Sequence, residues 1–277
     1  VSRFSSPENR KYLEDRDIET IAGDLLNPEF VQGLPDAKNV IYLAGTKFGT
    51  SGDEAYAWAM NAYLPGLIAE RYRDSRIIAL STGCVYPLVD VDSGGSKETD
   101  PPFPIGEYAQ SCLGRERLFE YGSLTNETQV TLVRLNYAVE MRYGVLVDIA
   151  TKVYNSQPVD VSMGYVNAIW QGDANALVLR SFRLCSSPPR IMNLTGSETI
   201  SVREMALRFG ELFGREPIVE GEEKSQALLS NASWVHRELG KPNVQLDQIV
   251  DWTAKWIEAD NPLLGKPTHF EVSDGKF

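Results

Sequence analysis

Short apolar runs alternate with helix-like segments through the first two thirds of the chain. Four runs have the length and composition of buried strands: Ile18–Ala22, Val40–Ala44, Ile77–Ser81 and Val130–Leu135. Three segments between or after them show helical character: Glu54–Arg73, Glu107–Tyr121 and Val145–Tyr154. Pro65 is expected to kink the first of these helices or to start a second one. This alternation predicts βαβ units and a doubly wound parallel sheet, which is an α/β fold.

The pattern changes after Asn155 to shorter elements. Arg190–Leu194 reads as a strand, and three helices follow, at Val202–Phe213 behind a capping box, at Leu228–Leu239 and at Leu246–Ile257. A Pro- and Gly-rich stretch, Pro87–Pro104, predicts a long loop. We therefore expect a larger sheet domain over residues 1–155. The remaining region, 156–277, is expected to return to the sheet and to form a smaller lobe.

Charge and composition exclude several classes of function. The 277 residues carry a formal net charge of -11 and a pI near 4.8, and such a surface disfavours nucleic-acid and membrane-surface partners. No apolar run approaches the roughly 18 residues of a membrane span, and we expect a cytoplasmic protein. Three widely spaced cysteines and two late histidines, His236 and His269, argue against a disulfide framework, a metal site and a Ser-His-Asp triad.

Two segments carry the candidate chemistry. Residues 81–86 read STGCVY at the end of a predicted strand, and residues 107–112 read EYAQSC at the start of the next predicted helix. Together they resemble the active site of the extended short-chain dehydrogenase/reductases, the NAD(P)-dependent epimerase/dehydratase family. That family pairs a Ser or Thr near a strand end with a Tyr-x-x-x-Lys motif, and here Cys112 stands at the Lys position. The resemblance extends over essentially the whole chain.

The resemblance implies a Rossmann-like dinucleotide-binding domain over 1–155 and a small substrate-side lobe within 156–277. The first βα unit is missing from this arrangement. Val1, Ser2 and Arg3 read as the end of a strand, and no glycine-rich G-x-G-x-x-G turn lies near the N-terminus. Such a turn lets backbone amides approach a pyrophosphate. Two interpretations stay open: the chain is a fragment of a longer protein, which we favour, or it is a truncated protein that binds no dinucleotide.

The expected catalytic residues are Tyr108, Thr82 and Cys112. By the resemblance, Tyr108 is the general acid/base, and Thr82 binds the substrate oxygen that gains or loses a proton, with Ser81 as its alternative. An unperturbed phenol has a pKa of about 10, too high for an efficient base at neutral pH. The family's Lys lowers that pKa, whereas a neutral thiol at position 112 supplies no such field. Whether this substitution abolishes catalysis stays open.

Other cations near the motif are candidates to replace the absent Lys. Arg115 shares the helix face of Tyr108, but it lies two helical turns, or about 10 Å, further along the axis. Lys47 follows the predicted strand end at Gly45 and is our preferred candidate. Both are also consistent with ordinary surface charge.

The resemblance also implies a set of cofactor contacts. The expected residues are Arg3, Asp24, Leu25, Leu43, Ala44, Gly45, Ser81 and Tyr108. Asp24 is expected to contact the adenine, although an Asp that caps the next helix is an equal alternative. Arg3 can pair with a 2′-phosphate, which slightly favours NADP over NAD, unless it is a solvated loop residue. No metal is expected.

The expected substrate is a sugar or nucleotide-sugar, contacted by Lys47, Tyr86, Asn136 and Arg142. Asn61 resembles a structural or water-holding Asn of the family. The first hypothesis is an oxidoreductase, isomerase or dehydratase that works by Tyr-assisted hydride transfer. The alternatives are a non-catalytic dinucleotide sensor and a ligand-free scaffold of the same fold. A homodimer through the helix of Tyr108 is expected by analogy.

Overall fold

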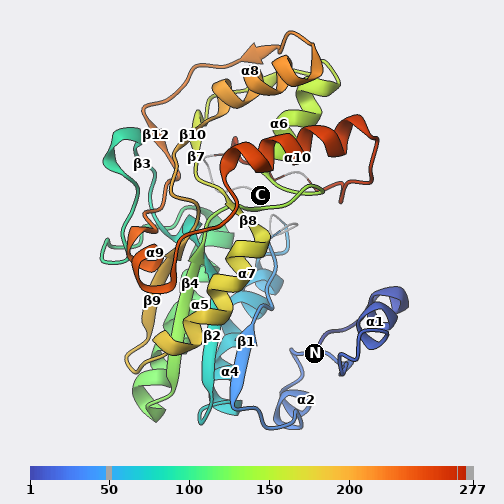
Figure 1. The fold of residues 1–277 in the computed structure, drawn as a ribbon. Coiled ribbons are helices and arrows are strands. Elements are labelled where there is room, and N and C mark those ends of the chain that lie inside the picture. The colour runs from blue at the N-terminus through green and yellow to red at the C-terminus, as the bar shows by residue number, and fades with distance from the viewer. Residues whose placement is uncertain (48–51, 267, 273–277) are drawn as a thin grey trace.

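The centre of the protein is a four-stranded parallel sheet, seen in a computed structural model that describes residues 1–47, 52–266 and 268–272 (Figure 1). The strand order is β1-β2-β4-β9, with bounds Asn39–Tyr42, Arg76–Thr82, Gln129–Leu135 and Arg190–Leu194. All three pairings are parallel. The predicted fold class is therefore confirmed, and each of these strands lies within two residues of its predicted position.

Helices cover both faces of this sheet. On one face lie α3 (Glu54–Trp58), a π-helical turn (Ala59–Tyr63), α4 (Leu64–Arg71) and α5 (Gly106–Asn126). On the other lie α7 (Gln171–Arg180) and α9 (Ser233–Leu239). Alternating side chains of β2 separate the two cores, because Ile77 packs with Phe119 of α5 while Ile78 packs with Leu177 of α7. This alternation explains why the central strands read as continuous apolar runs.

The predicted helix at residues 54–73 is interrupted as expected near Pro65. The π-helical turn comes directly before α4, and Pro65 is the second residue of α4. Proline has no backbone N–H and clashes with the carbonyl four residues earlier, so a wider turn accommodates it. That wider turn carries Asn61, which is buried.

A second core forms the smaller lobe above the sheet in Figure 1. It is built by α6 (Val145–Tyr154), α8 (Val202–Phe213) and α10 (Leu246–Glu258). Helix α8 begins as predicted, because the Ser201 hydroxyl accepts a hydrogen bond from Glu204 N at 3.2 Å. Helix α6 belongs to the predicted 1–155 domain but packs against α8 and α10. The proposed boundary at residue 155 stays a prediction.

Four two-stranded ladders connect the sheet and the lobe. They pair β3 (Val89–Asp90) with β12 (Gln226–Ala227), β5 (Ala138–Val139) with β8 (Ile169–Trp170), β6 (Val159–Asp160) with β11 (Val219–Glu220), and β7 (Tyr165–Val166) with β10 (Ile200–Ser201). Three 3-10 turns lie at Gly83–Val85, Val91–Ser93 and Ser181–Leu184. The predicted loop at 87–104 thus contains a short strand and a 3-10 turn.

The helix predicted at Glu107–Tyr121 extends to Asn126, and two other predicted elements are much shorter in the structure. The helix predicted at 228–239 starts only at Ser233, because Ser230 bridges to Ser96 and Asn231 Oδ1 accepts the Ser233 amide at 3.0 Å. The strand predicted at 18–22 is reduced to one parallel bridge, between Ser2 and Ala22. A strand needs ladder partners, and among the described residues this segment has only the Ser2 backbone.

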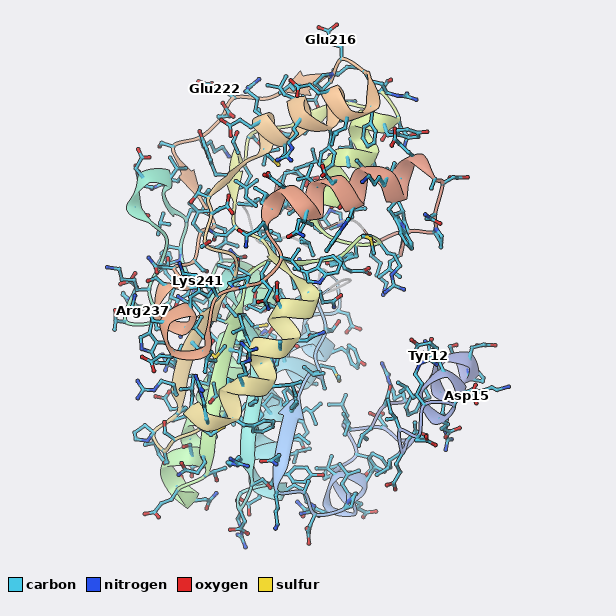
Figure 2. The ribbon with its side chains drawn as sticks, in the orientation of Figure 1. Tyr12, Asp15, Glu216, Glu222, Arg237 and Lys241 are labelled. Atoms are coloured by element: carbon cyan, nitrogen blue, oxygen red, sulfur yellow. The ribbon has the colours of Figure 1, made fainter. Side chains whose placement is uncertain are left out.

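The N-terminal segment also forms two short helices, α1 (Pro7–Glu14) and α2 (Pro28–Gln32). Helix α1, which carries Tyr12, buries none of its residues and stands away from the sheet in Figures 1 and 2. Helix α2 is capped by Asn27, whose Oδ1 accepts the amides of Glu29 and Phe30. The cap of this helix is therefore not Asp24, the alternative that the sequence left open.

Candidate functional site

A cavity of about 290 Å³ opens beyond the carboxyl ends of β2 and β4. Ligands of open α/β sheets bind at this edge. Its lining residues come from both sequence motifs and from the smaller lobe: Lys47, Ser81, Thr82, Cys84, Tyr108, Leu135, Asn136, Tyr137, Ala138, Tyr143, Gly144, Gln171 and Thr268. The structure therefore brings Thr82 and Tyr108 together at one cavity, as the spacing of the motifs predicts.

Thr82 and Tyr108 line the same cavity, at the end of a strand and at the start of a helix. Thr82 is the last residue of β2, and its hydroxyl accepts the Cys84 amide at 3.1 Å. Tyr108 lies in the first turn of α5, and the Thr82 side chain lowers the pKa of its phenol. Cys112 lies one helical turn further on and is 0% exposed. The site thus combines two hydroxyl groups that line one cavity with a buried thiol on the same helix as Tyr108.

The surroundings of Tyr108 favour its protonated form. Burial raises its pKa well above the ordinary value, Cys112 and Cys84 raise the pKa further, and Arg115 lowers it. Burial also raises the pKa of Cys112 to about 11. Both groups are therefore neutral at pH 7, and the Tyr108 phenol can serve as a hydrogen-bond donor rather than as a base.

Ser81 and Tyr86, both expected near ligands, belong instead to a buried polar network. Ser81 Oγ donates to Glu116 Oε1 at 2.6 Å, and Glu116 pairs with Arg134 at 2.7 Å. Arg134 Nη1 donates to the Tyr86 hydroxyl at 2.7 Å, and that hydroxyl donates to Asn193 at 2.9 Å. Tyr86 is 2% exposed and does not line the cavity, so its predicted substrate contact is not supported. Ser81 lines the cavity, but its hydroxyl is committed to Glu116.

The other expected substrate contacts are divided between two places. Lys47 lines the cavity, and its Nζ donates to Thr268 O at 3.3 Å. Burial lowers the pKa of Lys47, while Cys84, Asp148 and Cys112 raise it. Asn136 also lines the cavity, with its amide donating to Leu228 O at 3.2 Å.

Arg142, the fourth expected substrate contact, lies elsewhere. It lines a separate cavity of about 240 Å³ next to the C-terminal segment, and its Nε pairs with Glu140 Oε1 at 2.9 Å. Arg142 is not among the residues that line the Tyr108 cavity. The loop 140–143 turns back on itself, since the amides and carbonyls of Glu140 and Tyr143 pair, and this turn directs Tyr143 rather than Arg142 to the cavity.

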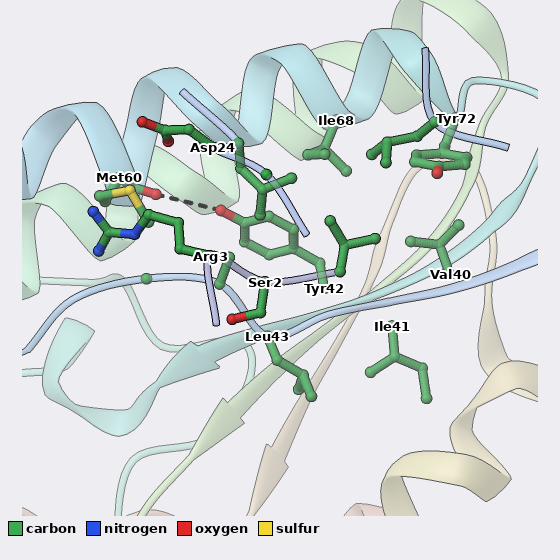
Figure 3. Close-up of a pocket in the computed structure, with 16 residues that line it drawn as sticks. Ser2, Arg3, Asp24, Val40, Ile41, Tyr42, Leu43, Met60, Ile68 and Tyr72 are labelled. Atoms are coloured by element: carbon green, nitrogen blue, oxygen red, sulfur yellow. Dashed lines mark hydrogen bonds between the residues drawn. The ribbon is translucent and has the colours of Figure 1, made fainter. Parts of the chain in front are cut away.

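A larger cavity, of about 510 Å³, lies beside β1, and six of the expected cofactor residues line it together: Arg3, Asp24, Leu25, Leu43, Ala44 and Gly45. Figure 3 shows Arg3 and Asp24 near Met60 at one end of this cavity, and Tyr72 and Val40 at the other. The Tyr42 hydroxyl donates to the Met60 carbonyl at 3.3 Å in its wall. The six expected cofactor residues come from distant parts of the sequence and line this one cavity, as the resemblance implied.

Arg3 and Asp24 are both accessible in this cavity. Asp24 Oδ1 accepts the Leu26 amide at 3.0 Å in a local turn, and its side chain is otherwise exposed. Arg3 is exposed, with its guanidinium 6.0 Å from the ring centroid of Tyr56. Leu43 is 70% exposed on the opposite wall. Among the described strands, β1 pairs only with β2, so its other edge faces this cavity.

Sequence reasoning missed several residues that line the Tyr108 cavity, namely Tyr137, Tyr143, Gln171 and Thr268. Tyr137 comes shortly after the end of β4. Its position could have marked it as a candidate, because ligands bind just beyond the carboxyl ends of parallel strands. Its backbone has φ of 40°, a conformation that non-glycine residues rarely adopt. Thr268 comes from the C-terminal segment, where it donates twice to Asp148 Oδ2. No sequence signal connects Thr268 to this cavity.

Within the described ranges, no cluster of three or more His, Cys, Asp or Glu side chains is arranged to hold a metal ion. Over those same ranges, no helix is both long and apolar enough to span a bilayer.

No protein-family model and no curated protein matches the sequence. Solved structures do resemble the fold. One is Pal from Bacillus thuringiensis, with a TM-score of 0.76 and 18% identity over 94% of this chain and 90% of that one. Another is UDP-glucose 4-epimerase from Thermotoga maritima with UDP-glucose, with a TM-score of 0.75 and 16% identity over 88% and 86% of the two chains.

A third similar structure is a dTDP-glucose 4,6-dehydratase double mutant from Streptomyces venezuelae, with NAD bound. Its TM-score is 0.76 at 16% identity, and the match covers 91% of this chain and 84% of that one. At these identities the likeness establishes the fold. The protein thus has the Rossmann-like α/β architecture of NAD-dependent epimerase/dehydratase family members.

Proposed function

We propose that the protein is an NAD(P)-dependent oxidoreductase of the epimerase/dehydratase type, acting on a sugar or nucleotide-sugar with Tyr108 as its acid/base. One observation carries this proposal. The Tyr108 and Thr82 side chains line the same cavity, beyond the carboxyl ends of parallel strands, and Thr82 lowers the pKa of the Tyr108 phenol. Two hydroxyls at such a position can hold one substrate oxygen and exchange a proton with it.

The described residues fit a dinucleotide at two places. The cavity beside β1 offers Asp24 and Arg3 to an adenosine, and Lys47 lines the Tyr108 cavity, where a nicotinamide ribose would lie. Gly45 and Ala44 lie on the chain between Leu43 and Lys47 and line the first cavity. The exposed guanidinium of Arg3 supports a preference for a 2′-phosphate, and hence for NADP.

The proposed chemistry follows from the groups that this chain supplies. Thr82 accepts from or donates to the substrate hydroxyl, and Tyr108 moves the proton of that hydroxyl. Because Tyr108 is protonated at neutral pH, it acts first as a donor to an oxygen that is gaining negative charge. A bound nicotinamide supplies hydride exchange at the carbon that carries this oxygen. Asn136 and Lys47 would position the remaining polar groups of the substrate.

The second candidate is a non-catalytic dinucleotide sensor of the same fold. The buried Cys112 favours it, because no ammonium stands one turn after Tyr108 to stabilise a phenolate. Cys112→Lys separates the two candidates. A large gain over a measurable wild-type rate supports an enzyme, whereas the absence of a rate in both forms supports the sensor.

The test of the proposal begins with binding. NAD and NADP are each added to the full-length protein in a thermal-shift measurement, and a rise in melting temperature is expected. Oxidation of NADH and of NADPH is then followed with a 4-keto nucleotide-sugar as the probe, in the wild type and in Tyr108→Phe and Thr82→Val, because a protonated Tyr108 donates in the direction of carbonyl reduction. Tyr108→Phe should lower the rate about 10²- to 10⁴-fold and leave cofactor binding unchanged.

Tyr121→Phe is the matched control, because Tyr121 lies on the same helix and is 68% exposed. Its rate should equal that of the wild type. Equal rates in Tyr108→Phe and the wild type would reject Tyr108 as the acid/base. The absence of any shift with either dinucleotide would reject both candidates and leave a scaffold. Exposed apolar residues just before α4 and on α5, Tyr63 and Leu124, support the proposed homodimer.

A further inference from the structure

Arg115 is a buried cation without a carboxylate partner among the residues that the structure describes. It is 7% exposed, and its Nη1 and Nη2 donate to Leu80 O at 2.6 Å and to Asn61 Oδ1 at 2.7 Å. Its Nε is buried without a hydrogen-bond partner. The neighbouring acid, Glu116, pairs with Arg134 instead. Because a guanidinium keeps its proton in proteins, the fold holds an uncompensated positive charge here.

Three groups near this charge can become negative. Two of them, the phenol of Tyr108 and the thiol of Cys112, belong to the candidate catalytic motif. The third is the phenol of Tyr42, which lines the cavity beside β1 and whose ring centroid is 5.6 Å from the guanidinium carbon. Burial raises the pKa of each of these groups, and Arg115 lowers the pKa of each.

Two further ionisable groups act on the pair formed by Tyr108 and Cys112. Cys84, on the 3-10 turn after β2, raises both pKa values, and Glu116, on α5, raises that of Cys112. The positive charge of Arg115 lowers both pKa values against burial and these neighbours. The Thr82 side chain also lowers the pKa of Tyr108, and the Tyr108 side chain lowers that of Cys112. Arg115 supplies its charge from the helix that carries the pair.

We propose that Arg115 is a positioning residue of this site. In this proposal, its buried guanidinium supplies, from the second turn after Tyr108, the positive charge that a Lys at position 112 would otherwise provide. The inference rests on the proposed function for its catalytic meaning. Its electrostatic part concerns the chain alone and can be measured without cofactor or substrate.

The surrounding residues are arranged around this guanidinium. A Cβ on Gly45 would overlap Arg115 Nη2 and would lie 2.9 Å from Asn61 Oδ1, so a side chain at position 45 conflicts with this placement. Asn61 also exchanges hydrogen bonds with the Thr46 backbone, at 2.9 and 2.8 Å. Arg115 is thereby linked through Asn61 to the loop that begins with Leu43 and leads to Lys47.

Lys47, the substitute cation preferred on sequence grounds, is placed differently. Its ammonium donates to the carbonyl of Thr268 in the C-terminal segment, and burial lowers its pKa. Burial therefore favours the loss of its positive charge as the pH rises, whereas a guanidinium stays charged throughout. Arg115 was discounted because two helical turns separate it from Tyr108, but its long side chain reaches back beneath Gly45.

The first experiment titrates the thiol and the phenol in the full-length protein without ligands. Cysteine labelled with ¹³C at Cβ and tyrosine labelled with ¹³C at Cζ report each ionisation by NMR, with Cys112→Ser and Tyr108→Phe as assignment variants. Arg115→Met should raise the pKa of Cys112 above its wild-type value of about 11, so that the thiolate fraction at a given pH falls at least tenfold. Arg115→Lys should stay close to the wild type.

Arg117→Met is the matched control, because Arg117 lies on the same helix in an exposed pair with Glu120. It should leave both titrations unchanged. An unchanged Cys112 titration in Arg115→Met would overturn the proposal and leave the proposed function untouched. An equal shift in Arg115→Lys and Arg115→Met would also overturn it, because the role would then be one of shape rather than charge.

A second experiment moves the charge and covers the case in which Arg115→Met does not fold. Cys112→Lys alone places a second buried cation next to Arg115 and should lower the melting temperature. The double variant Cys112→Lys/Arg115→Met restores a single charge and should be more stable than either single variant. A double variant less stable than both would contradict the proposal. Dinucleotide binding, measured in parallel, reports on the proposed function independently.

Discussion

Glu116 of α5 and Arg134 of β4 form a buried ion pair, with Nη2 2.7 Å from Oε2 and both side chains 2% exposed. A second hydrogen bond joins Arg134 Nε to Glu116 Oε1 at 3.0 Å. The pair fixes the helix of Tyr108 against the sheet, and the hydroxyls of Ser81 and Tyr86 complete its hydrogen bonding. A buried pair of this kind is sensitive to the loss of one partner.

Removing one partner of this pair should destabilise the fold strongly. Arg134→Met leaves the Glu116 carboxylate buried without its cation, and we expect unfolding free energy to fall by about 3–5 kcal/mol. Urea unfolding monitored by tryptophan fluorescence measures the change. Arg117→Met breaks an exposed ion pair with Glu120 and should change the unfolding free energy by less than about 1 kcal/mol. Similar losses in both variants would show that the buried pair contributes no more than a surface one.

Stability should fall at alkaline pH. Burial raises the pKa of Tyr42, Tyr108 and Tyr137 above the ordinary value of 10 in the folded state. Because the unfolded chain loses these protons at lower pH, their stabilising contribution is complete below about pH 10 and is lost as the pH rises beyond it. Urea unfolding between pH 8 and pH 11.5 measures this dependence.

Tyr42→Phe is the control for this alkaline loss, because it removes one of the three buried phenols. Above pH 10, its unfolding free energy should fall less steeply with pH than that of the wild type. The difference between the two slopes should be at most the contribution of one proton. A stability that stays constant to pH 11.5 in the wild type would contradict the assignment of these phenols as protonated in the fold.

A side chain at Gly45 should be poorly tolerated, because its Cβ would overlap Arg115 Nη2. Gly45→Ala is expected to destabilise the fold by about 1–3 kcal/mol. Gly33→Ala is the matched control, since a Cβ there meets only backbone oxygens at 3.5 Å and its φ of -78° suits any residue. Denaturant melts of the two variants give the comparison. Equal stability of both would mean that Arg115 has room to move aside.

Asp148 should hold the C-terminal segment at the edge of the Tyr108 cavity. Its Oδ2 accepts the Thr268 amide at 2.8 Å and the Thr268 hydroxyl at 2.6 Å. Asp148→Ala should therefore increase the exchange rate of the Thr268 amide at least tenfold. The reason is that a hydrogen bond to a charged group contributes about 1.5–3 kcal/mol to stability. Hydrogen–deuterium exchange measures it, and Asp74→Ala, at an exposed site, should show no change. Unaltered exchange in Asp148→Ala would remove this residue as an anchor.

The sequence predicted the sheet and the meeting of Thr82 with Tyr108 for clear reasons. Fully buried parallel strands leave continuous apolar runs, and the resemblance of the two motifs to the epimerase/dehydratase family implied that Thr82 and Tyr108 lie at one site. Tyr86 was misassigned because its hydroxyl finds Arg134 and Asn193 only in three dimensions. Arg115 was taken for surface charge because arginine is rarely buried without an acid. Such partners are separated by tens of residues and leave no local pattern.

Tyr137 places its ring at the Tyr108 cavity by holding a backbone φ of 40°, and its carbonyl accepts the Ile169 amide at 3.1 Å. A conformation of this kind costs about 1–3 kcal/mol for a residue with a side chain. Selection for thermal robustness alone would replace such a residue by asparagine or glycine. Its presence therefore points to a compromise between durability of the fold and the shape of the cavity wall.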